Sequence, residues 1–347
     1  MMKRWNTIAR YPAPARKVSG FSLIEFLVAS ILSMIVLIAV SSGYFVSRQL
    51  SDTALARLNV QQDLRNASNM IVRDARMAGS FGCFNMATHE AATVTEDADS
   101  EAAIRLRGNN QTNLIPVKVL SAADFQPADF AANSDALIFQ YGVGSASIVS
   151  QTGNSSELQI PTGDPLQNAG NTTPLVFSSC NVLDRPQRYT VARSDNRLTI
   201  SDINPALNTG HIANEFAVLR YTVNAYVIGT AGEQQGLFRF QLNDNGQWSN
   251  PQLLMPGITN MDMEYGYVNN CAVSGAASDA TAAETFEFVD ALKAGNDAVS
   301  PALIRITLNG GNDVAAATGT GVSAGDVHVY NIDATVRGGN TCADRTI

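Results

Sequence analysis

Glu25 is the side chain whose position in this sequence most clearly calls for specific chemistry. It is the only charged residue in the 26 residues from Phe21 to Val46. A carboxylate at membrane depth costs about 2.5–3.5 kcal/mol on insertion scales, and such groups usually pair with another group or mark a functional site. Two interpretations of Glu25 are therefore open from its position alone: it pairs with another group, or it is solvated near a membrane interface.

Histidines are scarce in this sequence, and none lies in a zinc-protease motif. They are His89, His211 and His328, and the sequence contains no HExxH. Oxygen-rich stretches at 243–246 and 310–313 lack the spacing of an EF-hand calcium loop, and Asn, Asp and Gly are also ordinary turn residues. We expect no enzyme activity, no metal and no other cofactor.

The four cysteines, Cys83, Cys180, Cys271 and Cys342, are widely spaced and contain no CxxC pair. An even number with such spacing indicates two disulfides in an oxidising compartment rather than a zinc site, which usually has close ligand pairs. Four cysteines allow three connectivities, and the sequence does not decide between them. The pairing we expect is Cys83–Cys180 and Cys271–Cys342, the second joining a loop to the C-terminal segment.

Charge is distributed unevenly along the chain. Residues 1–20 contain five basic side chains and no acid, so the remaining residues hold 18 basic and 31 acidic side chains. A body with a net charge of −13 repels phosphate backbones, so a general nucleic-acid-binding role is disfavoured.

The apolar run from Phe21 to Val46 is long enough to span a bilayer, which needs roughly 20 residues. Its basic flank is N-terminal, which predicts an N-in orientation with the cysteines outside the cytoplasm. An ordinary secretory signal has its cleavage site after the apolar region, whereas the small-residue site here, Ser19-Gly20, precedes it. Cleavage after Gly20 would leave a mature chain that begins with Phe21 and keeps its membrane helix.

Helical periodicity continues beyond the apolar run. A half-apolar stripe is predicted by three- and four-residue steps through Leu50, Ala54, Leu58, Gln61, Leu64, Ser68, Ile71 and Ala75. Proline is absent between Pro14 and Pro116, and Gly79 is a plausible stop. We expect one helix over about 22–78, roughly 85 Å long at 1.5 Å per residue. Its transmembrane part is 21–46, and its amphipathic part, 47–79, would pack on a globular head, 80–347.

The head has the pattern of antiparallel strands joined by long polar loops, which predicts an α+β fold. Expected strands are 136–142, 197–201, 216–229, 236–242, 261–268, 302–308 and 327–336. Expected loops or insertions are 88–113, 144–174 and 273–300. The aromatic residues Phe238, Phe240, Tyr265 and Tyr267 alternate along two of these strands, which favours core positions over a ligand-binding surface.

The stretch "GFSLIEFLVAS", residues 20–30, resembles the type III signal of type IV prepilins and pseudopilins: Gly, then Phe, with Glu at the fifth position after cleavage. Segments of the head resemble PilW-type minor pilins, namely "RMAGSFGC" (76–83), "PLVFSSC" (174–180), "AYVIGTAGEQQGLFRF" (225–240), "LLMPGITNMDMEYG" (253–266) and "ALIRITLNG" (302–310). The closing "NIDATVRGGN" (331–340) is similar to the last strand of many pilins. The segments extend from the leader to the C-terminal region, and the leader is much the most specific.

This resemblance implies a fold and a role. The basic leader 1–20 would be removed after Gly20 by a prepilin peptidase, and Phe21 would then be N-methylated. Glu25 would accept a bond from the Phe21 amine of an adjacent pilin during assembly. The long helix would pack on an antiparallel pilin head with large loop insertions.

The family role is structural. The chain would be a single-pass inner-membrane protein with a periplasmic head, incorporated into a cell-surface type IV pilus used in twitching motility. It would act in the complex that primes pilus assembly, near the filament tip. Its partners would be other minor pilins, the major pilin and a tip adhesin.

Two other interpretations stay open. A pseudopilin J subunit of a type II secretion system shares much of this plan, although such subunits are usually shorter than this chain. The second alternative, from another class, is a membrane-anchored periplasmic protein whose head binds a ligand.

Overall fold

The computed structural model describes residues 20–86, 94–95, 114–184, 186–201, 216–269, 285–293, 299–310 and 329–337. The chain divides into two compact units, Met1–Asp52 and Thr53–Ile347, with the boundary inside the long helix α1, Leu23–Met77. The second unit therefore includes the C-terminal part of α1 as well as the strands.

Helix α1 follows the predicted span closely. It ends where Ala78 N–H donates to Asp74 O at 2.9 Å and Gly79 adopts φ 77°, a left-handed conformation that suits glycine at a helix end. The expected helix over 22–78 and its stop at Gly79 are thus confirmed.

Within the described residues the strands form a short hairpin and two larger sheets. The hairpin pairs β1 with β2. The main path of the larger sheet has the order β11-β12-β7-β6-β13-β8-β9-β3. Off this path, β14 pairs with β13 and β15 with β14, while β4 pairs with β6, β5 with β13 and β10 with β8. The smaller sheet has the order β17-β16-β18-β19. All pairings are antiparallel except that of β3 with β9.

The bounds of the elements that follow α1 are β1 Ser80–Phe81, β2 Phe84–Asn85, β3 Val94–Thr95, β4 Val117–Leu120, β5 Ala131–Ala132, β6 Ala136–Thr152, β7 Ser155–Gln159, the 3-10 helix η3 Pro165–Asn168, β8 Pro174–Ser178, β9 Leu183–Asp184, β10 Gln187–Arg188, β11 Thr190–Ser194, β12 Arg197–Ser201, β13 Ala217–Ala231, β14 Gln234–Gln241, β15 Gln252–Pro256, β16 Ile258–Asn269, β17 Thr285–Val289, β18 Leu303–Gly310 and β19 Val329–Thr335.

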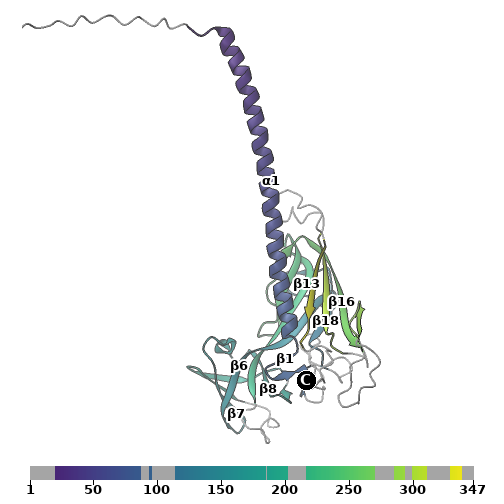
Figure 1. Cartoon of the computed structure of the whole chain (residues 1–347). Helices are drawn as coiled ribbons and strands as arrows, with labels where there is room; N and C mark the ends of the chain where they lie inside the picture. Colours follow the sequence, from purple (N-terminus) through teal and green to yellow (C-terminus); the bar gives the residue numbers. More distant parts are fainter. Residues whose placement is uncertain are drawn as a thin grey trace, which may run out of the picture. The chain divides into compact units, whose positions relative to one another are not determined.

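The main core lies between the C-terminal part of α1 and one face of each larger sheet. Figure 1 shows β13, β16 and β18 alongside this part of the helix. Ala67, Ile71 and Ala75 of α1 join a buried cluster with residues of β6, β13, β16, β18 and β19. The opposite face of the larger sheet buries a second cluster that includes Phe238 and Phe240. Because both its faces are covered, β13 is a nearly continuous buried strand.

The seven expected strands are all present, but two expected loops are wrong. The stretch 144–174 contains the second half of β6, all of β7 and η3, and 273–300 contains β17. The missed signal in the first is Gly153-Asn154, a two-residue turn between β6 and β7 in which Gly153 has φ 58°. Apolar residues in the flanking strands are sparse, so the polar composition concealed the alternation. Of the expected loop 88–113, the structure describes only Val94–Thr95, the strand β3.

The predicted stripe on α1 is partly wrong. Ile71 and Ala75 are buried, whereas Leu50 and Leu58 are exposed by 67% and 52%. The buried line runs instead through Ala56, Val60, Ala67, Ile71, Asp74 and Ala75. Four alanines, Ala56, Ala67, Ala75 and Ala78, are completely buried, because small side chains let the helix approach the sheets closely.

Candidate functional sites: the start of α1 and the Asp74 cluster

The first site is the start of α1, where the chain places Gly20, Phe21 and Glu25. Ser22 N–H donates to Glu25 Oε2 at 3.1 Å, and Phe26 N–H donates to Ser22 O at 3.2 Å. Ser22 is thus the residue before the helix, and Glu25, three positions later, turns back to its backbone. This is the glutamate half of a capping box, which satisfies a backbone donor at a helix start. The sequence signal was the Ser-x-x-Glu spacing of Ser22 and Glu25, which our sequence reasoning missed.

The surface around this start is apolar on every side. All large apolar side chains from Phe21 to Val46 are exposed, by between 49% and 87%. Helix α1 is long and apolar enough to cross a membrane, and it is the one such helix in the described part of the chain. So large an apolar surface requires lipid or another apolar partner. In the described structure the Glu25 carboxylate accepts one hydrogen bond, from Ser22.

The cysteines give one disulfide in the described residues. Cys83 and Cys180 are joined, 97 residues apart in sequence, as expected for the first pair. Cys83 lies in the turn between β1 and β2, directly after α1, and Cys180 follows β8. The bond therefore ties the exit of the helix to the larger sheet. Cys271 and Cys342 lie outside the described residues.

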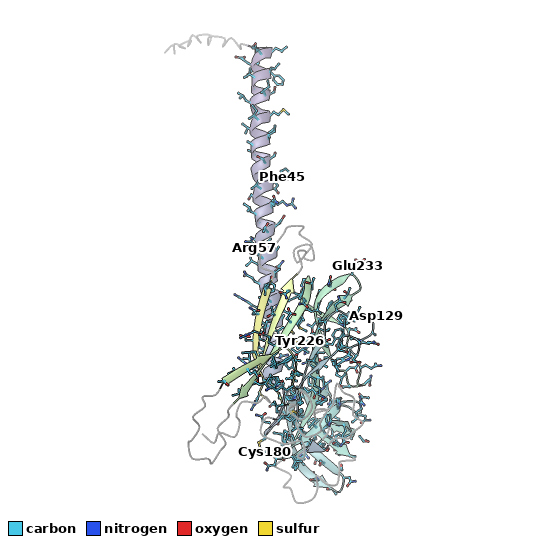
Figure 2. The ribbon with its side chains drawn as sticks, turned by 90° about the vertical axis from the view of Figure 1, so that its right-hand side faces the viewer. Phe45, Arg57, Asp129, Cys180, Tyr226 and Glu233 are labelled. Carbon is cyan, nitrogen blue, oxygen red and sulfur yellow. A yellow bond between two sulfur atoms is a disulfide. The ribbon has the colours of Figure 1, made fainter. Side chains whose placement is uncertain are left out.

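The second site is a buried carboxylate on α1 that the sequence reasoning did not single out. Asp74 is completely buried and contacts side chains of three strands. Tyr141 Oη donates to Asp74 Oδ1 at 2.9 Å, Tyr226 Oη donates to Oδ2 at 2.6 Å, and Asn224 Nδ2 donates to Oδ2 at 2.8 Å. Arg239 Nε lies 3.8 Å from Oδ2. We call Asp74, Tyr141, Asn224, Tyr226 and Arg239 the Asp74 cluster; Figure 2 labels Tyr226 within it.

Strand register explains why these side chains converge. Tyr226 of β13 pairs directly with Arg239 of β14, and Thr222, two positions before Asn224, pairs with Tyr141 of β6. Residues two apart in a strand point to the same face. The three strands thus present donors and a cation to one point on the helix, where Asp74 follows the buried Ile71 by one turn.

Burial dominates the electrostatics of the cluster. Burial first, and the neighbouring Asp74 charge second, raise the pKa values of Tyr141 and Tyr226 above their ordinary value. Both phenols therefore stay protonated as donors through neutral pH. Arg239, whose side chain is 15% exposed, and Arg73, whose Nε lies 3.5 Å from Asp74 Oδ1, supply positive charge.

The arrangement holds the helix and offers nothing to a substrate. Asp74 has no solvent exposure, and both its oxygens accept bonds from the strands. Buried charges persist when paired and hydrogen-bonded in this way. The cluster therefore fixes the rotation and axial position of this part of α1 against the larger sheet.

Two further sequence predictions concern the remaining polar and aromatic residues. Phe238, Phe240, Tyr265 and Tyr267 are at most 2% exposed, so their core assignment is confirmed.

In the stretch 243–246, the Asp244 carboxylate accepts from Arg220 Nη2 at 2.7 Å and from Thr173 Oγ1 at 2.8 Å. These oxygens already have protein donors, as in an ion-paired turn. The other stretch, 310–313, is described only at Gly310.

Comparison with known proteins gives no match to any family model, curated protein or solved structure. The functional argument consequently rests on the chain's own residues.

Proposed function

We propose that this chain is a pilin-class subunit, specifically a PilW-type minor pilin that acts in assembly of a type IV pilus. The observation that carries the proposal is Gly20-Phe21 followed by Glu25 at the start of a long, exposed apolar helix. Cleavage after Gly20 creates an amine at Phe21, four residues from the carboxylate. The described structure leaves Phe21 87% exposed, which is the condition for reaching another subunit.

Assembly follows from simple physical chemistry in this proposal. The apolar part of α1 holds the subunit in the inner membrane before assembly and packs against other subunits afterwards. Glu25 accepts a charge-assisted bond from the amine of Phe21 in a neighbour, which offsets the cost of a carboxylate in an apolar medium. The chain performs no catalysis, and processing and energy come from partner proteins.

The Asp74 cluster and the disulfide support a mechanical role for the head. A filament subunit transmits load between its helix and its head. The buried cluster and the Cys83–Cys180 bond connect the C-terminal part of α1 and its exit to the larger sheet. An oxidising compartment, such as the periplasm, suits the disulfide.

The first test is the N-terminus of the mature chain, determined by mass spectrometry in cells with and without prepilin peptidase. We expect N-methylated Phe21 only when the peptidase is present. A chain that keeps residues 1–20, or that is cut after the apolar run, contradicts the proposal and favours an anchored ligand-binding protein. Deletion then separates the pilin classes: loss of surface pili and twitching supports the minor pilin, and loss of protein export supports the secretion pseudopilin.

A further inference from the structure

The exposed side of the C-terminal part of α1 carries basic and apolar side chains without an acid. We define the outer helix face as Leu55, Leu58, Gln62, Arg65, Asn69 and Arg76, all of which are exposed. At about 100° per residue they lie within an arc of about 80°. The acids of Thr53–Met77 lie elsewhere: Asp74 is buried, and Asp63 is partly buried and lies outside this arc.

This basic face contrasts with the charge of the rest of the unit. Residues 80–347 contain 13 basic and 27 acidic side chains. The net charge of this part of a second copy is therefore opposite to that of the outer helix face. A specific contact also requires a fixed arrangement of acids and a place for the two leucines.

One face of the smaller sheet provides both. We define the outer sheet face as Asp262, Glu264, Phe286, Phe288, Arg305 and Asp333, which lie on the side opposite the core. On β19 the alternation is complete: Tyr330, Ile332 and Ala334 are buried, and the residues between them are exposed. Three carboxylates and one guanidinium leave this face acidic.

Cross-strand contacts hold these side chains in place. Glu264, Arg305 and Asp333 are opposite one another in register, with Arg305 Nε 3.0 Å from Asp333 Oδ1 and Nη1 3.5 Å from Glu264 Oε2. Asp262 Oδ2 accepts from Asn309 Nδ2 at 3.0 Å. The carboxylates keep exposed surface, 44% for Glu264 and 53% for Asp333.

Exposed aromatic rings border the acidic residues. Phe286 and Phe288 of the edge strand β17 are exposed by 60% and 37%, and their rings stack with centroids 6.4 Å apart. Arg305 lies over the Phe288 ring, 4.5 Å from its centroid. The outer sheet face thus offers an apolar part on β17 and carboxylates on β16 and β19, with Arg305 of β18 between them.

We propose that the outer helix face of one copy binds the outer sheet face of a second copy, with Leu55 and Leu58 on the Phe286 and Phe288 rings and with Arg65 near the carboxylates. The spacings agree. Leu55 and Arg65 are about 15 Å apart along the helix at 1.5 Å per residue. Three strand steps from β17 to β19 span about 14 Å at 4.7–4.9 Å per step.

Such a contact joins two different surfaces and is therefore heterologous. One copy keeps an unused sheet face and the other an unused helix face, so the contact repeats and generates an open filament unless the rotation closes a ring. Exposed ion pairs are individually weak and screened by salt, so the contact is effective chiefly when the subunits are already held side by side. It requires neither Glu25 nor cleavage after Gly20, so it stands apart from the proposed function.

A zero-length cross-link tests the contact directly in the full chain, purified in detergent micelles. The variant Arg65→Lys keeps the charge and supplies an amine that carbodiimide can couple to a carboxylate. We expect a covalent dimer whose linked peptides join position 65 to position 262, 264 or 333. Dimers linked only elsewhere, or no dimer, overturn the proposal.

A mixing experiment tests its heterologous character. Arg65→Glu reverses the charge of the helix face at the contact, and Asp262→Lys/Glu264→Lys reverses the charge of the sheet face while leaving Asp333 to pair with Arg305. Each variant alone should lose at least about fivefold in self-association measured by sedimentation, since favourable pairs become repulsive. The two mixed together should form heterodimers, because one supplies an intact helix face and the other an intact sheet face.

The matched control is Arg57→Glu, the same charge change on α1 at a position that lies outside the arc of the outer helix face at about 100° per residue. Figure 2 labels Arg57 on the helix. It should leave self-association unchanged. Thermal unfolding of every variant checks that the head is folded, and the cross-link from the charge-conserving lysine variant decides the question if a reversal variant unfolds. Equal loss in the control, or a mixture that stays monomeric with both heads folded, overturns the proposal.

Discussion

Two carboxylates on the same helix have opposite surroundings. Asp74, in the unit Thr53–Ile347, is completely buried and accepts three hydrogen bonds from two strands, with Arg239 nearby. Glu25, in the unit Met1–Asp52, lies among exposed apolar side chains and accepts one bond from the backbone of Ser22. The comparison teaches that a charge in an apolar segment can be compensated within the chain or, as proposed for Glu25, by another subunit.

The largest expected effect on stability comes from removing the compensated charge. Asp74→Ala leaves Arg239 and three buried donors without their acceptor. We expect the free energy of unfolding to fall by about 3–5 kcal/mol, as when one partner of a buried pair is removed. Chemical denaturation of the full chain in detergent, followed by near-UV circular dichroism, measures it. The matched control is Asp63→Ala, which lies on the same helix but is only partly buried; equal losses in the two variants would show that the cluster has no special role.

The next effect sharpens the description of how α1 is held. Cys83→Ser/Cys180→Ser removes a cross-link that spans 97 residues. The expected loss is about 2–4 kcal/mol, chiefly because the unfolded chain gains freedom. Comparing oxidised and reduced wild-type protein in the same unfolding assay provides a second estimate. A double variant as stable as the oxidised wild type would contradict the prediction.

Alkaline pH should weaken the Asp74 cluster in a defined direction. The pKa values of Tyr141 and Tyr226 are raised in the folded protein above the ordinary value of 10.0. Their contribution is therefore fully present below pH 10 and is lost as pH rises above it, because the unfolded state releases these protons first. Each tyrosine adds a slope of up to about 1.4 kcal/mol per pH unit.

The variant Tyr226→Phe isolates this slope. Denaturant midpoints between pH 8 and pH 11 should fall less steeply for the variant than for the wild type, although the variant is less stable at pH 8. Identical slopes would indicate that Tyr226 titrates as an ordinary phenol in the folded protein.

The smallest effect on stability, and the sharpest test of the comparison, comes from Glu25→Gln. Glutamine also serves at the third position of a capping box, so helix α1 should keep its start and the helical signal should not change. Its negative charge is lost, so pilus assembly should fail if Glu25 pairs with an amine of another subunit. Counting surface pili in cells that carry the variant measures this outcome.

Ser22→Ala is the converse variant for this site. It removes the Ser22 hydroxyl while keeping the Ser22 backbone N–H and the Glu25 charge, and the loss of a favoured residue before the helix should weaken the helix start by about 0.5–2 kcal/mol. Assembly should persist. If Ser22→Ala abolishes pili and Glu25→Gln does not, capping is the role of this site and the intersubunit pair is wrong.

Much of the fold could be predicted from residue patterns. Three signals predicted the bounds of α1 to within a residue at each end. They are the apolar run from Phe21 to Val46, whose only charge is Glu25, the absence of proline, and the stop at Gly79. Strands with clear alternation, such as β13, β18 and β19, were found in place. The strand β7 and the second half of β6 were missed, because Ser, Thr and Gly dominate there and their strand character depends on neighbouring strands.

The sequence by itself determined the features that depend on local order: the helix, the Ser22 and Glu25 spacing and the even cysteine count. Only the tertiary structure decided which side of α1 is buried and which strands meet Asp74. The physical reason is that helix periodicity allows several candidate stripes, and the alanines on α1 select one only when a sheet packs closely against them. Asp74 likewise appears in the sequence as an ordinary helix acid, and it acquires its role only when strand register brings Tyr141, Asn224 and Tyr226 to the same point.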